Sequence, residues 1–154
     1  MENKLQARLP KTLGYLGLVP IAVSTILIFF DSYHLIFWRN MLLTYAVVIL
    51  SFLGALHWAF AMTLNNLAAK KRQTMMVWSV LPSLIAWAAL FIPPKYGYLL
   101  LSCFFVFSLL MDLKLAQTAT LPTWYIPLRF RLTVVMTSCL MATAFLLKPL
   151  LINA

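Results

Sequence analysis

The chain has 154 residues, of which 64% are hydrophobic and only 10% are charged, and its formal net charge is +9. A soluble domain carries roughly 25% charged residues, and a chain of this length cannot hide so much apolar surface from water. The composition therefore excludes a soluble globular fold and indicates an integral membrane protein. The basic residues lie between apolar segments, so we attribute the charge to membrane topology and expect no nucleic-acid partner.

Five apolar segments approach the length needed to cross a bilayer, which is about 20 residues of α-helix. The first is too long for the core of a cleaved signal sequence, so we expect it to be a retained helix. The sequence predicts an all-α polytopic membrane protein, a compact bundle of five transmembrane helices forming one membrane domain over residues 1–154. The predicted spans are residues 12–30, 41–64, 75–92, 98–116 and 132–152.

The connections between these segments differ in character. Residues 65–74 contain three consecutive basic residues, and residues 93–97 form a turn built on two prolines and a glycine. The longest connection, residues 117–131, is predicted to be an interfacial loop. Trp124 and Tyr125 support that prediction, because Trp and Tyr collect where a membrane meets water.

The distribution of basic residues predicts the orientation. Cytoplasmic loops of membrane proteins carry an excess of Lys and Arg. With the N-terminus in the cytoplasm and the C-terminus outside, only Arg39, Lys95 and Lys148 lie on the outer side. The other nine of the twelve Lys and Arg residues lie inside, namely Lys4, Arg8, Lys11, Lys70, Lys71, Arg72, Lys114, Arg129 and Arg131.

Ionisable residues inside the apolar segments are costly in a bilayer and invite a functional explanation. In the predicted topology His57 lies roughly 10 Å from the inner surface, and Asp112 lies about one turn from it. Arg129 and Arg131 approach from the same side. Because a buried acid needs a partner, we expect Asp112 to meet His57 or one of the arginines, with Ser108 sharing its hydrogen bonds.

This polar layer allows two interpretations. A histidine beside a carboxylate can take up and release protons near neutral pH, which would suit a proton relay or an anion-binding pocket. Alternatively, His57 joins helices through a hydrogen bond and Asp112 forms a structural salt bridge. The sequence leaves both open.

Small and aromatic residues mark candidate surfaces for helix packing or for a pocket. Small side chains let helix backbones approach closely in a membrane, and proline inside a helix removes a backbone donor and favours a kink, here in the third predicted span. The candidate residues of this kind are Ser51, Gly54, Ala55, Trp58, Ala59, Pro82 and Trp87.

The sequence shows no signature of an enzyme, a metal site or a cofactor. It has no glycine-rich phosphate loop and no nucleophile elbow. Cys103 and Cys139 both lie within apolar segments, and one histidine at depth is too few for a bis-histidine haem. We therefore expect no catalytic activity, metal or cofactor.

Four motifs in order along the chain resemble a known family. They are LGYLGLVP (13–20), YAVVILSFLGALHW (45–58), LPSLIAWAAL (81–90) and LPTWYIPLRFRLT (121–133). Together they resemble a bacterial and mitochondrial family of integral membrane proteins of unknown function that includes human transmembrane protein 69. The resemblance implies five spans in a bacterial plasma membrane or mitochondrial inner membrane and no established activity. The motif positions are Gly54, His57, Trp58, Pro82, Trp87, Pro122, Trp124, Tyr125, Arg129 and Thr133.

These observations predict a multi-pass protein of the bacterial inner (plasma) membrane, surrounded by lipid. The leading hypothesis for its function is an accessory or assembly subunit that packs against other membrane-protein subunits of a larger complex. The alternatives are a small proton-coupled transporter that uses His57 and Asp112, or a protein that handles a lipid or quinone. In the last case Arg129 and Arg131 would hold an anionic headgroup.

Overall fold

The computed structural model describes residues 2–64 and 67–146, with side chains for residues 8–64 and 67–145. Every regular element in this part of the chain is helical, and five helical stretches are long and apolar enough to cross a membrane, which confirms the predicted fold class. The elements are α1 (Glu2–Leu16), α2 (Val19–Phe30), α3 (Leu35–Thr63), α4 (Ala69–Ala88), the 3₁₀ helix η1 (Ala89–Phe91), α5 (Pro94–Ala116) and α6 (Tyr125–Leu146).

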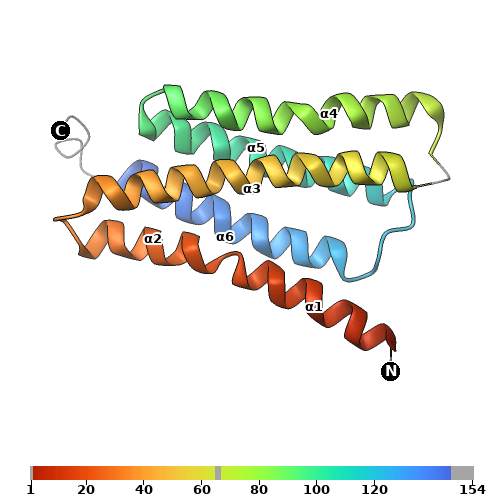
Figure 1. The fold of residues 1–154 in the computed structure, drawn as a ribbon, viewed down its shortest axis with the longest axis horizontal. Coiled ribbons are helices and arrows are strands. Elements are labelled where there is room, and N and C mark those ends of the chain that lie inside the picture. Colours follow the sequence, from red (N-terminus) through yellow and green to blue (C-terminus); the bar gives the residue numbers. More distant parts are fainter. Residues whose placement is uncertain (1, 65–66, 147–154) are drawn as a thin grey trace.

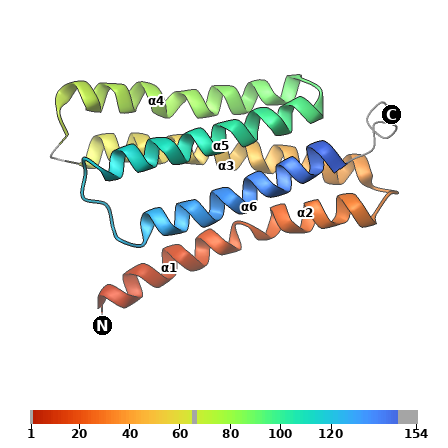
Figure 2. The same ribbon diagram turned by 180° about the vertical axis from the view of Figure 1, so that it is seen from behind.

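The helices run side by side along one axis, with α3 packed against α2, α4 and α5 (Figures 1 and 2). Helix α6 completes the bundle by packing against α5 on one side and against α1 and α2 on the other. The core between the helices is formed by aliphatic and aromatic side chains, including Ile21, Leu42, Leu50, Leu101, Phe105 and Leu140.

The outer surface of the bundle is apolar as well. In the most apolar 18-residue stretch of the first span, only 17% of the residues are buried inside the protein. In the corresponding stretches of the last two spans, 39% are buried. Side chains such as Val48, Val106 and Val134 therefore point away from the core. Such a surface is stable when lipid covers it, as the composition predicts.

The first predicted span is divided into two helices. Pro20 lacks the N–H that would donate to the carbonyl of Leu16, and its ring displaces that carbonyl, so α1 ends at Leu16 and α2 begins at Val19. The hydroxyl of Tyr45 on α3 donates to the carbonyl oxygen of Gly17 at 2.9 Å. This bond supplies a partner for a backbone group at the break, as burial in a membrane requires.

Helix α3 begins at Leu35, earlier than the predicted residue 41, because Asp31 organises the turn before it. The carboxylate of Asp31 accepts hydrogen bonds from the indole Nε1 of Trp38 at 3.0 Å and from the backbone N–H of His34 at 3.2 Å. The Trp38 bond, followed by the contacts with His34, lowers the pKa of Asp31 to about 2. The carboxylate is therefore ionised at neutral pH and can hold the turn in place.

The predicted interfacial loop 117–131 and the predicted fifth span 132–152 need correction. Helix α6 starts at Tyr125, so Arg129 and Arg131 lie in its first two turns and not in a loop. Hydropathy places the start of the span too late because it counts the arginines as unfavourable, whereas both side chains have polar partners in the structure. Residues 147–152 of the predicted span lie outside the described residues.

The basic residues gather at one end of the bundle. The starts of α1, α4 and α6 and the ends of α3 and α5 lie together there, whereas Arg39 and Lys95 lie near the opposite end (Figure 1). The basic residues at this end with described side chains are Arg8, Lys11, Lys70, Lys71, Arg72, Lys114, Arg129 and Arg131. Successive spans therefore run in opposite directions, as the predicted orientation assumes. That the basic end faces the cytoplasm stays a prediction.

Gly54 allows α3 and α4 to pack closely. A Cβ atom at this position would overlap the carbonyl oxygen of Ser79 and would lie 3.4 Å from the Cβ of Pro82. Helix α4 continues through Pro82 to Ala88, and the buried proline ring packs against α3 at this crossing. Backbone atoms cannot move aside as the tip of a side chain can, so this crossing requires glycine.

We predict that Gly54→Ala lowers the stability of the bundle by about 1–3 kcal/mol, the usual cost of overpacking. Gly14→Ala is the matched control. Both substitutions favour helix, but the new Cβ at Gly14 meets only flexible leucine side chains, the nearest atom being Leu132 Cδ1 at 3.2 Å. Thermal unfolding in detergent, followed by circular dichroism, measures the difference. Equal unfolding midpoints for the two variants would show that the α3–α4 crossing tolerates a methyl group.

Candidate functional site

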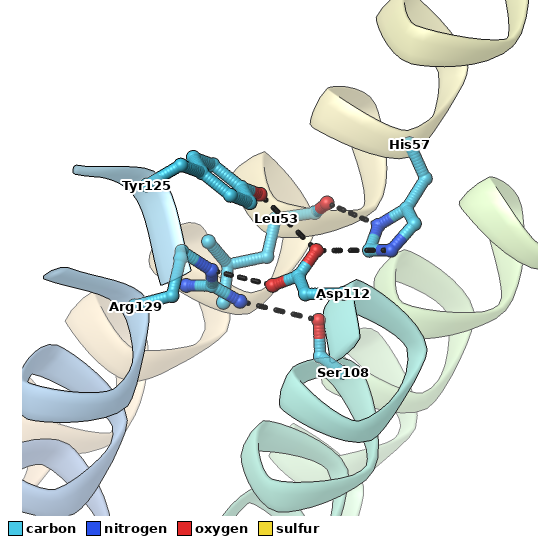
Figure 3. A network of polar contacts seen from close by, with 6 residues as sticks. All are labelled: Leu53, His57, Ser108, Asp112, Tyr125 and Arg129. Atoms are coloured by element: carbon cyan, nitrogen blue, oxygen red, sulfur yellow. Dashed lines mark hydrogen bonds and ion pairs between the residues drawn. The ribbon is translucent and has the colours of Figure 1, made fainter. Parts of the chain in front are cut away.

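Five polar side chains from three helices meet inside the bundle and form what we call the buried polar cluster: His57 of α3, Ser108 and Asp112 of α5, and Tyr125 and Arg129 of α6 (Figure 3). The residues are sealed from the surroundings, with exposed fractions of 1% for His57, 0% for Asp112 and 5% for Arg129. The structure thus brings together His57, Asp112 and Arg129, three of the four residues of the predicted polar layer.

Asp112 is the centre of the buried polar cluster. Its Oδ2 accepts a hydrogen bond from Arg129 Nε at 2.6 Å, and its Oδ1 accepts one from the hydroxyl of Tyr125 at 3.1 Å. Arg129 Nη2 also reaches Ser108 Oγ at 3.5 Å, the outer limit for a hydrogen bond. A charge-assisted bond between an arginine and a carboxylate compensates both charges, which is what a buried acid requires.

His57 lies between two oxygen atoms. Its Nδ1 is 3.1 Å from the carbonyl oxygen of Leu53, and its Nε2 is 3.2 Å from Asp112 Oδ1. The second distance suits an ion pair, but the alignment is not that of a hydrogen bond, so we describe it as a close electrostatic contact. A neutral imidazole donates through one nitrogen only, whereas an imidazolium can donate to both oxygens. His57 therefore connects the backbone of its own helix, at Leu53, with the carboxylate of Asp112 on α5.

Aromatic rings surround the buried polar cluster. The ring of Trp78 on α4 stands edge-on to His57 with 6.4 Å between centroids, and Phe60 on α3 stands edge-on to Tyr125 at 5.5 Å. These rings keep the cluster dry, and a dry, weakly polarisable environment strengthens the attraction between Asp112 and Arg129.

Arg131, the fourth residue of the predicted layer, lies elsewhere. Its side chain is exposed, and its Nη1 donates to the hydroxyl of Tyr15 on α1 at 3.2 Å. Residues two positions apart on a helix face different directions, so Arg129 and Arg131 cannot both point at Asp112. Tyr125, predicted as an interfacial residue, is instead buried and belongs to the cluster. Its spacing of four from Arg129 was the signal in the sequence that both share one helix face.

The other predicted packing residues divide between the inside and the outside of the bundle. Gly54 and Pro82 are buried at the α3–α4 crossing, and Ser51 donates to the carbonyl oxygen of Val47 on its own helix. Trp58 points outward from α3 with 47% of its surface exposed. The side chains exposed on the outer surface are Ala55, Trp58, Ala59 and Trp87.

An apolar pocket of about 410 Å³ lies next to the buried polar cluster, between α1, α3, α5 and α6. This volume is within the range of small-molecule sites, about 300–1,000 Å³. Three of its lining residues on α6 carry polar groups: Tyr125, Arg129 and Thr133. The other lining residues are Pro10, Leu13, Gly14, Gly17, Leu18, Ile49, Phe52, Leu53, Leu56, Phe105, Trp124, Leu128, Leu132 and Met136.

Thr133 is the most informative residue of this apolar pocket. It is 3% exposed, and its hydroxyl has no hydrogen-bond partner among the described residues. An unpaired buried hydroxyl is costly, so the pocket offers a polar ligand atom a ready partner. The pocket itself could not be found by sequence reasoning, because its lining comes from four spans. Among the described residues, no group of three or more His, Cys, Asp and Glu side chains is placed to hold a metal ion.

The fold and the buried polar cluster define a class, the polytopic α-helical membrane proteins with a charged cluster enclosed between their spans. Within that class, the chain belongs to the family described as "Protein of unknown function (DUF3429)", which it matches over residues 6–145. It is also similar to Transmembrane protein 69 of Xenopus tropicalis, with 30% identity over 123 residues. The alignment covers 80% of this chain and 48% of that relative, so the chain spans about half of the relative's length. No solved structure matches the chain.

We predict that Arg129→Met destabilises the bundle by about 3–5 kcal/mol, because it leaves the Asp112 carboxylate buried without its cationic partner. The double variant Asp112→Leu with Arg129→Met removes both charges and should recover most of that loss. Unfolding in detergent, monitored by circular dichroism, compares the two. A double variant no more stable than the single one would mean that the unpaired charge is not the cause of the loss.

Proposed function

We propose that this protein is a non-catalytic membrane protein that binds an amphiphilic molecule with a long apolar chain in the apolar pocket between α1, α3, α5 and α6. One observation carries the proposal. The pocket is apolar along most of its lining, and one face of α6 adds the polar groups of Tyr125, Arg129 and Thr133. A ligand with an apolar body and a small polar group matches that distribution.

The apolar lining explains how the pocket accommodates the apolar chain of the ligand. It does not explain why one amphiphile would be bound in preference to another. A lipid tail is as apolar as a leucine side chain, so moving a chain from the bilayer into the pocket changes its solvation little. Binding must then depend on shape and on the polar residues. The Thr133 hydroxyl, unpaired in the structure, and the Arg129 guanidinium are the groups that a ligand carbonyl, hydroxyl or phosphate oxygen would meet.

The rest of the buried polar cluster would have a positioning role. His57 and Asp112 do not line the pocket, whereas Arg129 belongs both to the pocket and to the cluster. Asp112 holds the Arg129 Nε at 2.6 Å and the Tyr125 hydroxyl at 3.1 Å, which orients both side chains at the edge of the pocket.

The multi-pass membrane location is supported by the five spans and by the family. The finer location is part of the proposal. We infer a bacterial inner (plasma) membrane with a cytoplasmic N-terminus, which the excess of basic residues at one end of the bundle supports.

The pocket proposal predicts that an amphiphile remains bound when the protein is extracted gently from its membrane, and native mass spectrometry followed by solvent extraction identifies it. Leu132→Trp should displace the amphiphile, because half-buried Leu132 lines the pocket and an indole would fill part of it. Val134→Trp is the matched control, since Val134 lies on the outer surface of the same helix. Retention of the amphiphile in Leu132→Trp, or its absence from the wild-type protein, would contradict the proposal.

Association with a larger membrane complex is a second candidate function, and a groove on the outside of α3 and α4 favours it. The groove has a volume of about 560 Å³ and is bordered by small side chains, which let another helix approach closely. Its lining residues are Ala55, Trp58, Ala59, Met62, Thr63, Ser79, Val80 and Ser83.

If another subunit occupies this groove, Ala55→Leu should weaken the association, because the added atoms hold the partner helix away. Co-purification of partner subunits from native membranes, quantified by mass spectrometry, measures the effect. Val48→Leu, which also enlarges an exposed side chain of α3 but lies outside the groove, should leave the association intact. Unchanged co-purification with Ala55→Leu would exclude the groove as the contact surface.

A further inference from the structure

A second cavity adjoins the apolar pocket at the end of the bundle where the basic residues gather. It has a volume of about 310 Å³ and shares Trp124 and Leu128 with the apolar pocket. We call it the basic pocket. Its lining residues are Lys11, Tyr15, Thr123, Trp124, Pro127, Leu128 and Arg131.

The basic pocket holds two cations, Lys11 and Arg131, and none of the described residues that line it is acidic. The chain has three acidic residues, Glu2, Asp31 and Asp112. Asp112 is bound by Arg129, Asp31 follows the last residue of α2, and α1 begins at Glu2, about 13 Å along the helix from Lys11. Two positive charges in one pocket repel each other, so an anion placed between them is favoured.

One cation of the basic pocket, Arg131, is held in place by a neighbouring side chain. The Tyr15 hydroxyl accepts a hydrogen bond from Arg131 Nη1 at 3.2 Å, which ties α1 to α6 and directs the guanidinium. The hydroxyl of Thr123 and the indole N–H of Trp124 add neutral donors to the lining. An arginine fork with a lysine and neutral donors is a set of groups that suits a phosphate.

The apolar pocket extends away from the basic pocket into the bundle. The two linings overlap along α6, but that of the basic pocket ends at Arg131 whereas that of the apolar pocket continues to Met136, about 7.5 Å further at helical rise. One leaflet of a bilayer contributes about 15 Å of hydrocarbon. The part of the apolar pocket beyond Arg131 is therefore about half as deep as the hydrocarbon of one leaflet, which suits the part of an acyl chain nearest the headgroup, with the basic pocket at the level of the headgroups.

We propose that the two cavities form one site for an anionic phospholipid, with an acyl chain in the apolar pocket and the phosphate held by Lys11 and Arg131. The inference rests on the proposed function and names its ligand class. A neutral isoprenoid such as a quinone would use Thr133 and Arg129 but would leave both cations of the basic pocket without a counter-charge.

The test uses the full chain in nanodiscs that contain equal amounts of phosphatidylglycerol and phosphatidylcholine with identical acyl chains, and native mass spectrometry counts the lipids that stay bound. We expect the wild-type protein to retain phosphatidylglycerol in preference. The double variant Lys11→Gln with Arg131→Gln should lose roughly tenfold or more in that preference, because each substitution removes a direct charge-assisted bond to the phosphate.

Lys70→Gln with Lys114→Gln is the matched control. Both lysines are exposed at the same end of the bundle, and neither lines the two cavities. The control removes the same charge and should keep the preference. An equal loss in both double variants would reveal a general attraction of the basic surface and would overturn the inference.

Two further outcomes separate the inference from the proposed function. If the wild-type protein retains both lipids equally and Leu132→Trp releases them, the apolar pocket binds lipid but the basic pocket does not select the headgroup, so only the inference fails. If no lipid is retained, both fail. Inorganic phosphate added at millimolar concentration should not displace the lipid; displacement would show that the site binds phosphate alone.

Discussion

The ion pair between Arg129 and Asp112 is the contact on which the half of the bundle nearest the basic end depends. Neither charge could be buried alone, and the 2.6 Å bond between them lets α6 carry an arginine between the spans. The same carboxylate binds Tyr125 and faces His57, so one side chain of α5 connects α5 to α6 and α3. This connection sets the position of α6, and α6 in turn forms one wall of both cavities.

The lipid environment accounts for the other main features of the fold. Helices in a bilayer gain little from hiding apolar surface, so they associate through close packing and through polar groups that find partners. The α3–α4 crossing at Gly54 is an example of the first, and the bond from Tyr45 to the Gly17 carbonyl oxygen is an example of the second. The abundant apolar surface of the bundle is consistent with that environment.

Two arginines that are close together in the sequence of α6 have different surroundings in the structure. Arg131 faces the basic pocket and Arg129 faces the cluster and the apolar pocket, although the two residues are separated by only one position. Arginines on different sides of one helix can thus serve two purposes, one as part of an enclosed ion pair and the other as a ligand for an anion near the membrane surface.

The sequence by itself determined the fold class, because five apolar segments of sufficient length require five spans whatever their partners. It also placed His57 and Asp112 at similar depth, since helical rise is regular. Only the tertiary structure decided that Arg129 and not Arg131 meets Asp112, that Tyr125 joins them, and that α6 begins at Tyr125 and not near residue 132. Hydropathy is a sum over neighbouring residues, whereas the energy of a buried charge is set by a partner on another helix. For the same reason the apolar pocket, whose lining comes from four spans, became visible only when the spans were packed together.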